Sequence, residues 1–274
     1  ARYRRAGCYP RRDLFEAVVI ATRHCFAANL RCMDSNRPLP ITPGQALHQE
    51  VMRQVLEKVQ DTPYVLKGGA ALVFTRKLSR HSADLDFDSK QRVNLEGRLR
   101  AGAEAAGVKL VSLKAVKDTG TVQRYKMHYL DPESGQDRLL KVETSFRQPP
   151  NESDIETVDG IRTYAVGVLF DMKLAAAEGR TQARDLYDLA YLARFYGNQL
   201  TPDRLARAEA FTDNLEDLFS RYAESFAADA ALGQYATPED TAIALRIAVE
   251  EQLEPGSCGF CGVGGSIPLA EGFL

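Results

Sequence analysis

Residues 64–88 read YVLKGGAALVFTRKLSRHSADLDFD, and this stretch decides the fold. Its first residues, Tyr64-Val65-Leu66, form a short apolar strand, and a helix begins after it at Gly68-Gly69. Two glycines let the backbone come close to a ligand, and the first N–H groups of a helix are free to bind a phosphate. A tight strand-to-helix turn without a ligand explains the same pattern, so the glycine pair alone does not identify a site.

The end of this stretch, Asp84-Leu85-Asp86-Phe87, alternates acidic and apolar residues as a strand does. Residues two apart on a strand point to the same face, so Asp84 and Asp86 converge while Leu85 and Phe87 pack on the other side. Two close carboxylates repel each other unless a cation lies between them, and Mg²⁺ prefers such oxygen ligands. The alternative is a solvent-facing acidic strand edge. Asp88, in the same phase, slightly favours that alternative or marks a third, outer carboxylate.

A third carboxylate lies further along, in the predicted strand 138–146. Glu143 shares a strand face there with Lys141. If this strand pairs beside residues 84–88, Glu143 joins the two aspartates. Three carboxylates on adjacent strands can hold two metal ions, which stabilise the attacking and leaving oxygens of a phosphoryl transfer.

The remaining local patterns predict alternating helices and strands. Thr42 and Pro43 are the N-cap and first residue of a predicted helix that runs to residue 59, and Asp159-Gly160 is a strong hairpin turn. Further helices are predicted over residues 12–30 and 92–106, and further strands over 108–117, 121–130, 138–146, 155–158 and 161–164. Helical spacing dominates from residue 166 to about residue 251, with breaks near Gly179, Gly197-Asn198 and Gly233.

These patterns predict an α+β fold, in which a mixed β-sheet with flanking helices is followed by a C-terminal helical bundle. We expect an α/β domain over residues 1–165 and a helical domain over residues 166–252. Residues 253–274 are Gly-rich and lack periodicity, so we expect them to form a mobile tail.

The composition argues against several classes of protein. The 274 residues are 45% hydrophobic and 26% charged, which supports a sizeable core and argues against disorder of the whole chain. No apolar run approaches the roughly 20 residues of a transmembrane helix, and no signal-peptide segment follows the basic N-terminus, so we expect a cytoplasmic protein without a membrane partner. Five cysteines at scattered positions do not form a disulfide framework, and Cys258 and Cys261 lack the second pair that a structural zinc site needs.

Charge is unevenly distributed along the chain. The net charge is −2, but residues 1–60 and 61–150 each carry +5, whereas residues 151–274 carry −12. The first half could therefore face a polyanion, although a solvated mixed surface is the simpler explanation of the charge alone. Four basic side chains on adjacent predicted strands could meet an RNA backbone, namely Lys114, Lys117, Arg124 and Lys126.

Taken together, LKGGAAL, RHSADLDF and KVETSF resemble motifs of the DNA polymerase β-like nucleotidyltransferase superfamily. More narrowly, they resemble those of the AbiEii/AbiGii-type nucleotidyltransferase toxins of bacterial toxin–antitoxin systems. FDMKLAAAEGRTQARDLYDLAYL is similar to the family's lysine-containing helix followed by an Arg-Asp-x-x-Asp helix. The motifs occur in the family's order across residues 64–192, close to half of the chain. Ala70 departs from the family, which often carries Thr there, but the backbone donors remain.

The resemblance implies a role for each matching residue. Asp84 and Asp86 match the metal-binding pair and Glu143 the third carboxylate, and all three are expected to bind metal and to be catalytic. Catalytic roles are also implied for Lys173, which would contact the triphosphate, and for Asp188. The implied nucleotide-binding residues are Lys67, Gly68, Gly69, Ser82, Lys173, Arg184 and Asp185. Ser82 also matches a Ser/Thr that certain relatives have phosphorylated by a kinase-like antitoxin, and a phosphate there would repel the triphosphate.

Spacing in the helical half gives the resemblance mixed support. Lys173, Arg180, Arg184 and Asp188 are 7, 4 and 4 residues apart, which places them on one stripe of an unbroken helix. Gly179 indicates a break, so the stripe is expected to form where two helices meet. An ordinary solvated salt-bridge face is the alternative.

The resemblance implies an Mg²⁺-dependent nucleotidyltransferase, with Mn²⁺ as an alternative metal, that transfers a nucleoside monophosphate from an NTP to an RNA acceptor. The expected acceptor is the 3′ end of tRNA, where the addition would block aminoacylation and translation, and a cognate antitoxin is the expected partner. Two other interpretations stay open, a small-molecule nucleotidyltransferase of the antibiotic-modifying kind and a nucleotide-binding or interaction protein with an inactive site. The basic first half mildly favours a polyanionic acceptor, and the intact Asp84/Asp86 pair argues against an inactive site.

Overall fold

A seven-stranded mixed sheet organises residues 39–253, which are the residues that the computed structural model describes. Its strands are β1 (Val65–Lys67), β2 (Asp84–Asp88), β3 (Lys109–Asp118), β4 (Val122–Leu130), β5 (Asp137–Ser145), β6 (Ile155–Val158) and β7 (Ile161–Tyr164). Their order across the sheet is β3-β4-β5-β2-β1-β7-β6. The neighbours β2 and β5 are parallel, as are β1 and β7, and the other neighbours are antiparallel.

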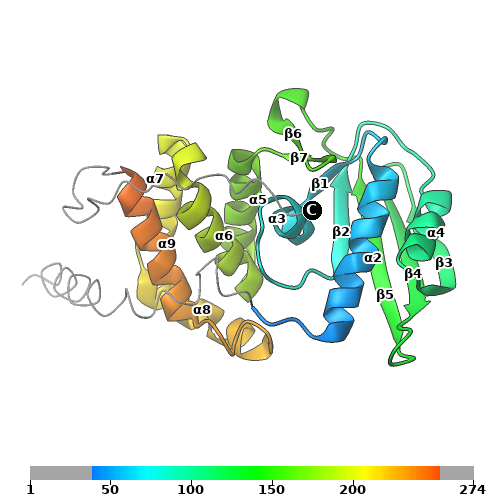
Figure 1. Ribbon diagram of the computed structural model, residues 1–274. Coiled ribbons are helices and arrows are strands. Elements are labelled where there is room, and N and C mark those ends of the chain that lie inside the picture. Colours follow the sequence, from blue (N-terminus) through cyan, green and yellow to red (C-terminus); the bar gives the residue numbers. More distant parts are fainter. Residues whose placement is uncertain (1–38, 254–274) are drawn as a thin grey trace, which may run out of the picture.

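Eight α-helices accompany this sheet within the described residues. They are α2 (Pro43–Val59), α3 (Gly68–Thr75), α4 (Glu96–Ala105), α5 (Val166–Gly179), α6 (Ala183–Tyr196), α7 (Pro202–Phe211), α8 (Leu215–Ala228) and α9 (Pro238–Leu253). Figure 1 shows α5 to α9 gathered at one end of the molecule, with α2 and α4 beside the strands at the other end. This arrangement confirms the predicted α+β fold. Within residues 39–253, none of the helices has the length and apolarity to cross a membrane.

One face of the sheet forms the core under α2 and α4. Leu85, Val142 and Tyr125 occupy paired positions on β2, β5 and β4, and each is at most 4% exposed. The helices are tied to this face by polar contacts, since the Tyr125 hydroxyl accepts from the Leu95 N–H (3.4 Å) and His48 hydrogen-bonds the Tyr129 hydroxyl (2.6 Å). Alternation along the strands therefore leaves the carboxylates of β2 on the opposite face.

Short-range sequence signals give most of these elements correctly. Thr42 caps α2 in a capping box with Gln45, and Asp159-Gly160, both with positive φ, form the turn between β6 and β7. The helix predicted over 92–106 begins only at Glu96, because the Asn94 carboxamide accepts a hydrogen bond from the Glu96 N–H (2.9 Å). The predicted helix over 12–30 and the tail from residue 254 lie outside the described residues.

The close packing of α2 on α4 can be tested with two glycines of α4, one at the contact and one away from it. A Cβ added at Gly102 would lie 2.7 Å from Val55 Cγ2 and 2.9 Å from its Cα, whereas a Cβ at Gly97 meets nothing within 4 Å. We expect Gly102→Ala to lower the free energy of unfolding by about 1–3 kcal/mol through overpacking. Gly97→Ala should leave it unchanged or raise it by up to about 1 kcal/mol. Urea unfolding of both variants checks this, and equal effects would contradict the described packing.

Candidate active site

The register between β2 and β5 brings three carboxylates to one face of the sheet. Asp86 pairs with Glu143 and Asp84 with Lys141, and residues directly opposite on paired strands share a face. Neighbouring strands lie about 4.8 Å apart. The strand predicted over residues 138–146 therefore pairs beside residues 84–88, as the placement of Glu143 with the two aspartates required.

Cations of the same face compensate two of these carboxylates. Lys141 Nζ lies 2.6 Å from Asp84 Oδ2, and Arg124 Nε lies 2.5 Å from Glu143 Oε2. Among residues 39–253, the carboxylate of Asp86 has no hydrogen-bond or ion-pair partner. Burial raises the pKa of this carboxyl against the opposing charge of Lys141, and the charges of Asp84 and Glu143 add to the rise. Asp86 is thus the group whose negative charge a bound cation would stabilise most.

This donor set fits a hard divalent cation. Asp84 and Asp86 offer carboxylate oxygens on one face, the ligands that Mg²⁺ prefers. Within residues 39–253 no three acidic, His or Cys side chains are already gathered around one metal position. Glu143 and Asp84 are each held by a cation, so metal binding requires these ion pairs to open.

A glycine corner lies beside Asp86. β1 ends at Lys67, which pairs with Asp86 on β2, and α3 begins at Gly68 with φ +70°. The positive φ favours glycine at this position, and a Cβ there would lie in ordinary contact with Asp86 Oδ2, at 3.5 Å. No side chain caps the start of α3, which leaves its first N–H groups free for an anion.

A cavity of about 600 Å³ opens between this corner and α5. Five of the predicted site residues line it, namely Lys67, Gly68, Asp86, Lys173 and Asp185. Its other lining residues are Leu72, Asp88, Ser145, Arg147, Gln148, Leu169, Met172, Ala176 and Arg180. The predicted residues outside the lining are Gly69, Ser82, Asp84, Glu143, Arg184 and Asp188. The cavity is thus polar at the sheet and at Lys173, with an apolar wall from α3 and α5.

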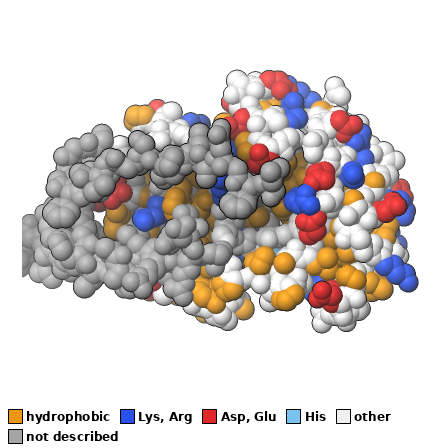
Figure 2. Space-filling view, viewed as in Figure 1, with side chains coloured by type: hydrophobic (Ala, Val, Ile, Leu, Met, Phe, Trp, Pro, Cys, Tyr) orange, Lys and Arg blue, Asp and Glu red, His pale blue; other side chains and the backbone are white. Residues whose placement is uncertain are grey.

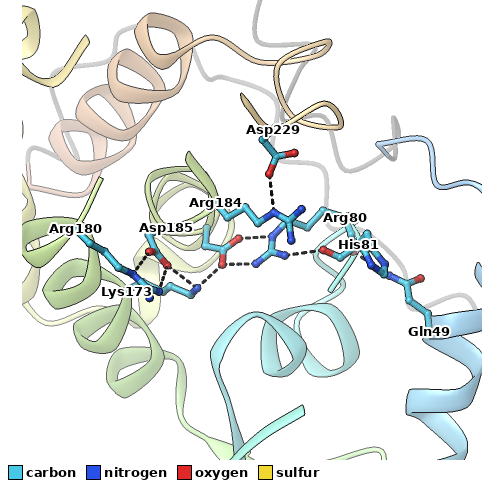
Figure 3. Close-up of polar contacts among 9 residues, drawn as sticks. Gln49, Arg80, His81, Lys173, Arg180, Arg184, Asp185 and Asp229 are labelled. Atoms are coloured by element: carbon cyan, nitrogen blue, oxygen red, sulfur yellow. Dashed lines mark hydrogen bonds and ion pairs between the residues drawn. The ribbon is translucent and has the colours of Figure 1, made fainter. Parts of the chain in front are cut away.

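A buried ion network fixes Lys173 in this cavity (Figure 3). Lys173 Nζ lies 2.6 Å from Asp188 Oδ2 and 3.2 Å from Asp185 Oδ1. Arg80 binds the same Asp188 carboxylate through two hydrogen bonds of 2.7 and 2.6 Å, and Arg180 donates to Asp185 (2.7 Å). The predicted meeting of two helices is confirmed, because α5 ends at Gly179 and α6 begins at Ala183.

Asp188 is fully buried inside this network. Burial alone would raise the pKa of its carboxyl, but the adjacent charges of Arg80 and Lys173 outweigh burial and hold the pKa below its usual value. An ionised carboxylate without access to the cavity can position Lys173 and cannot readily exchange a proton with a substrate.

Arg80 is a site residue that the sequence did not single out. It is 6% exposed, and a Cβ on Gly69 would lie 2.6 Å from its Nη2, so the second glycine makes room for the guanidinium. Its place two residues before Ser82 in RHSADLDF was the available signal, but its partner lies 108 residues away in the chain.

Three predicted nucleotide-binding residues lie outside the cavity lining, namely Gly69, Ser82 and Arg184. Ser82 is 6% exposed in the segment between α3 and β2. Arg184 donates to Asp229 (2.7 Å) beyond the end of α8, as Figure 3 shows. Arg180, which sequence analysis placed only on the stripe, lines the cavity instead.

Comparison with known proteins gives one family match and several similar structures. Residues 50–253 match the family model described as nucleotidyl transferase AbiEii toxin, type IV TA system. The crystal structure of JHP933 from Helicobacter pylori is 33% identical with a TM-score of 0.73, and the match covers 79% of this chain and 94% of that chain. A candidate nucleotidyltransferase from H. pylori is also 33% identical with a TM-score of 0.72, covering 78% of this chain and 97% of that chain. None of the curated proteins compared shows a significant match.

Opposite pKa shifts at two carboxylates predict opposite effects on stability. Asp86→Asn removes a charge without an ion pair, so the metal-free protein should unfold at the same or a higher urea concentration. Asp188→Asn leaves Arg80 and Lys173 without a full counter-charge in a buried place. We expect it to lower the free energy of unfolding by about 3 kcal/mol. Urea unfolding in the presence of EDTA measures both variants. An Asp188→Asn variant as stable as the wild type would show that this carboxylate does not hold the network together.

Proposed function

Because the chain belongs to the AbiEii family of nucleotidyl transferase toxins from type IV toxin–antitoxin systems, and so is a nucleotidyltransferase, we propose that it transfers a nucleoside monophosphate from an NTP to RNA. The proposed acceptor is the 3′ end of tRNA, the proposed metal is Mg²⁺ or Mn²⁺, and the proposed place of action is the cytoplasm. The family implies an antitoxin partner. The observation that carries the proposal is the pairing of Asp86 with Glu143 beside the Gly68 corner.

The NTP would bind in the cavity between the sheet and α5. Lys67, Lys173 and Arg180 line it and supply positive charge for a triphosphate, and the first N–H groups of α3 add backbone donors at Gly68. Asp185 and Asp188 hold the Lys173 ammonium in place before the nucleotide arrives. Helices α5 and α6 thus complete the site, which supports treating residues 166–252 as a domain that contributes to it.

Asp84 and Asp86 would hold the metal, with Glu143 as the third ligand. When bound, Mg²⁺ would neutralise charge on the phosphates and on the attacking oxygen. For this to happen, Lys141 and Arg124 must leave the carboxylates that they neutralise in the structure. Both side chains are then free to bind the anionic substrate.

The reaction would be an in-line displacement at the α-phosphorus. Glu143 accepts the proton of the acceptor hydroxyl, and the hydroxyl oxygen forms a bond to the α-phosphorus. The bond from that phosphorus to the bridging oxygen of the β-phosphate breaks, and pyrophosphate leaves. Lys173 and Arg180, at the cavity wall, would stabilise the charge that develops on the leaving group.

Incubation with each labelled NTP, Mg²⁺ and total bacterial tRNA tests the proposal. We expect label on RNA with the wild type and none with Asp86→Ala, because that substitution removes the carboxylate without a cation partner. Asp203→Ala, an exposed aspartate at the start of α7, is the matched control and should transfer at the wild-type rate. Label on a small molecule only would favour the antibiotic-modifying class, and equal transfer by Asp86→Ala would refute the metal assignment.

Substitutions of the two arginines near the α5–α6 corner, Arg180 and Arg184, are expected to affect nucleotide binding differently. Arg180 lines the cavity with a side chain that is 56% exposed, so Arg180→Gln should raise the KM for NTP about tenfold with little effect on folding. Arg184 lies outside the cavity lining and donates to Asp229, so Arg184→Gln should change that KM less than about twofold. Steady-state kinetics at saturating RNA measure both. The reverse order would return the nucleotide contact to Arg184.

A further inference from the structure

Basic side chains form two rows that run across the sheet to the carboxylates. In the first row, Lys114 pairs with Lys126, Lys126 with Lys141, and Lys141 with Asp84. In the second row, Lys117 pairs with Arg124, Arg124 with Glu143, and Glu143 with Asp86. Each row therefore begins on the edge strand β3, crosses β4 and β5, and ends at a predicted metal ligand on β2.

Such rows of like charges lower the stability of the sheet when no partner is bound. Like charges placed directly opposite on neighbouring strands destabilise a sheet, and Lys114, Lys126 and Lys141 stand in three consecutive strands. The innermost cations are neutralised by Asp84 and Glu143. The outer ones, Lys114, Lys117 and Lys126, are exposed and have no hydrogen-bond or ion-pair partner among residues 39–253. This arrangement indicates a polyanion as the missing partner.

The opposite face of the sheet has no comparable concentration of charge. It is covered by α2 and α4, where exposed cations have acidic neighbours, as Arg53 has Glu50 and Arg100 has Glu96. Around these helices Figure 2 shows basic and acidic side chains interspersed. The exposed arginines of these helices are thus paired with acids, whereas the exposed lysines on the face that carries the carboxylates are not.

We propose that this lysine face, defined by Lys114, Lys117 and Lys126, binds the phosphate backbone of a single-stranded acceptor end and directs its terminal hydroxyl to Glu143 and Asp86. The inference rests on the proposed function and specifies the surface that the acceptor uses. A small acceptor would occupy only the carboxylate end and would leave the lysines of β3 and β4 without a role. From β3 to β2 the rows span three strand spacings, about 14 Å, which is the length of about four stacked nucleotides.

The central test is the triple variant K114Q/K117Q/K126Q, which leaves every carboxylate and every cavity-lining residue in place. We expect its Kd for a 12-nucleotide single-stranded RNA to rise at least tenfold at low salt. Loss of three phosphate contacts should reduce the slope of log K against log salt by about 2. The KM for NTP should stay within twofold of the wild type.

The matched control is R53Q/K58Q/R100Q, which removes three cations from α2 and α4 on the other face. It should leave RNA affinity and its salt dependence unchanged. Thermal melting shows whether the triple lysine variant is folded. Because the substitutions relieve like-charge repulsion, we expect its melting temperature to equal or exceed that of the wild type.

Binding and transfer separate the two proposals. If the wild type binds the RNA through the lysines but transfers no label to any RNA, the proposed function fails and the surface assignment stands. If the triple variant binds RNA as tightly as the wild type, or loses affinity no more than the control does, the surface assignment fails. A triple variant that keeps RNA affinity and loses only antitoxin binding would show that the face is a protein interface, and would also overturn the proposal.

Discussion

The register of β2 against β5 is the constraint on which the site depends. A slip of one residue would turn Glu143 into the core and bring Val142 or Thr144 beside Asp86, because successive side chains on a strand point to opposite faces. The buried Leu85 and Phe87 exclude that slip, since they hold one face of β2 under α2 and α4. The same packing that stabilises the core thus sets the carboxylates together, and it also aligns both basic rows with them.

A second constraint joins the helical part of the chain to the sheet. Lys173 is 8% exposed, and a buried ammonium is tolerated only beside counter-charges, here Asp185 and Asp188. Arg80 completes the network from the segment that leads into β2. The single carboxylate of Asp188 therefore links α5, which carries Lys173, to the segment before the metal-binding strand β2 that is predicted from the sequence. Asp188 thus holds Lys173 in the cavity without lining the cavity itself. The arrangement also explains the need for glycine at position 69, where any side chain would displace Arg80.

Much of the fold was predictable because its signals are local. The Thr42 cap, the Asp159-Gly160 turn and the period-two pattern of residues 84–88 each depend on a few neighbouring residues, and each is confirmed. The placement of Glu143 needed only one assumption about strand pairing. Long-range ion pairs were beyond the sequence, since nothing near Arg80 indicates a partner 108 residues away. The position of Arg180 in the cavity lining was missed for a similar reason, because Arg180 follows the end of α5 in an extended conformation, which helical spacing does not represent.

The most direct test of this account is a crystal structure with Mn²⁺ and a non-hydrolysable NTP. The account predicts anomalous density for the metal at Asp84 and Asp86, with the ion pair between Lys141 and Asp84 broken. It also predicts the triphosphate against Lys67, Lys173 and Arg180, in the cavity beside Gly68. A nucleotide bound elsewhere, or a metal-free site with Lys141 still on Asp84 in the presence of saturating Mn²⁺ and nucleotide, would contradict it.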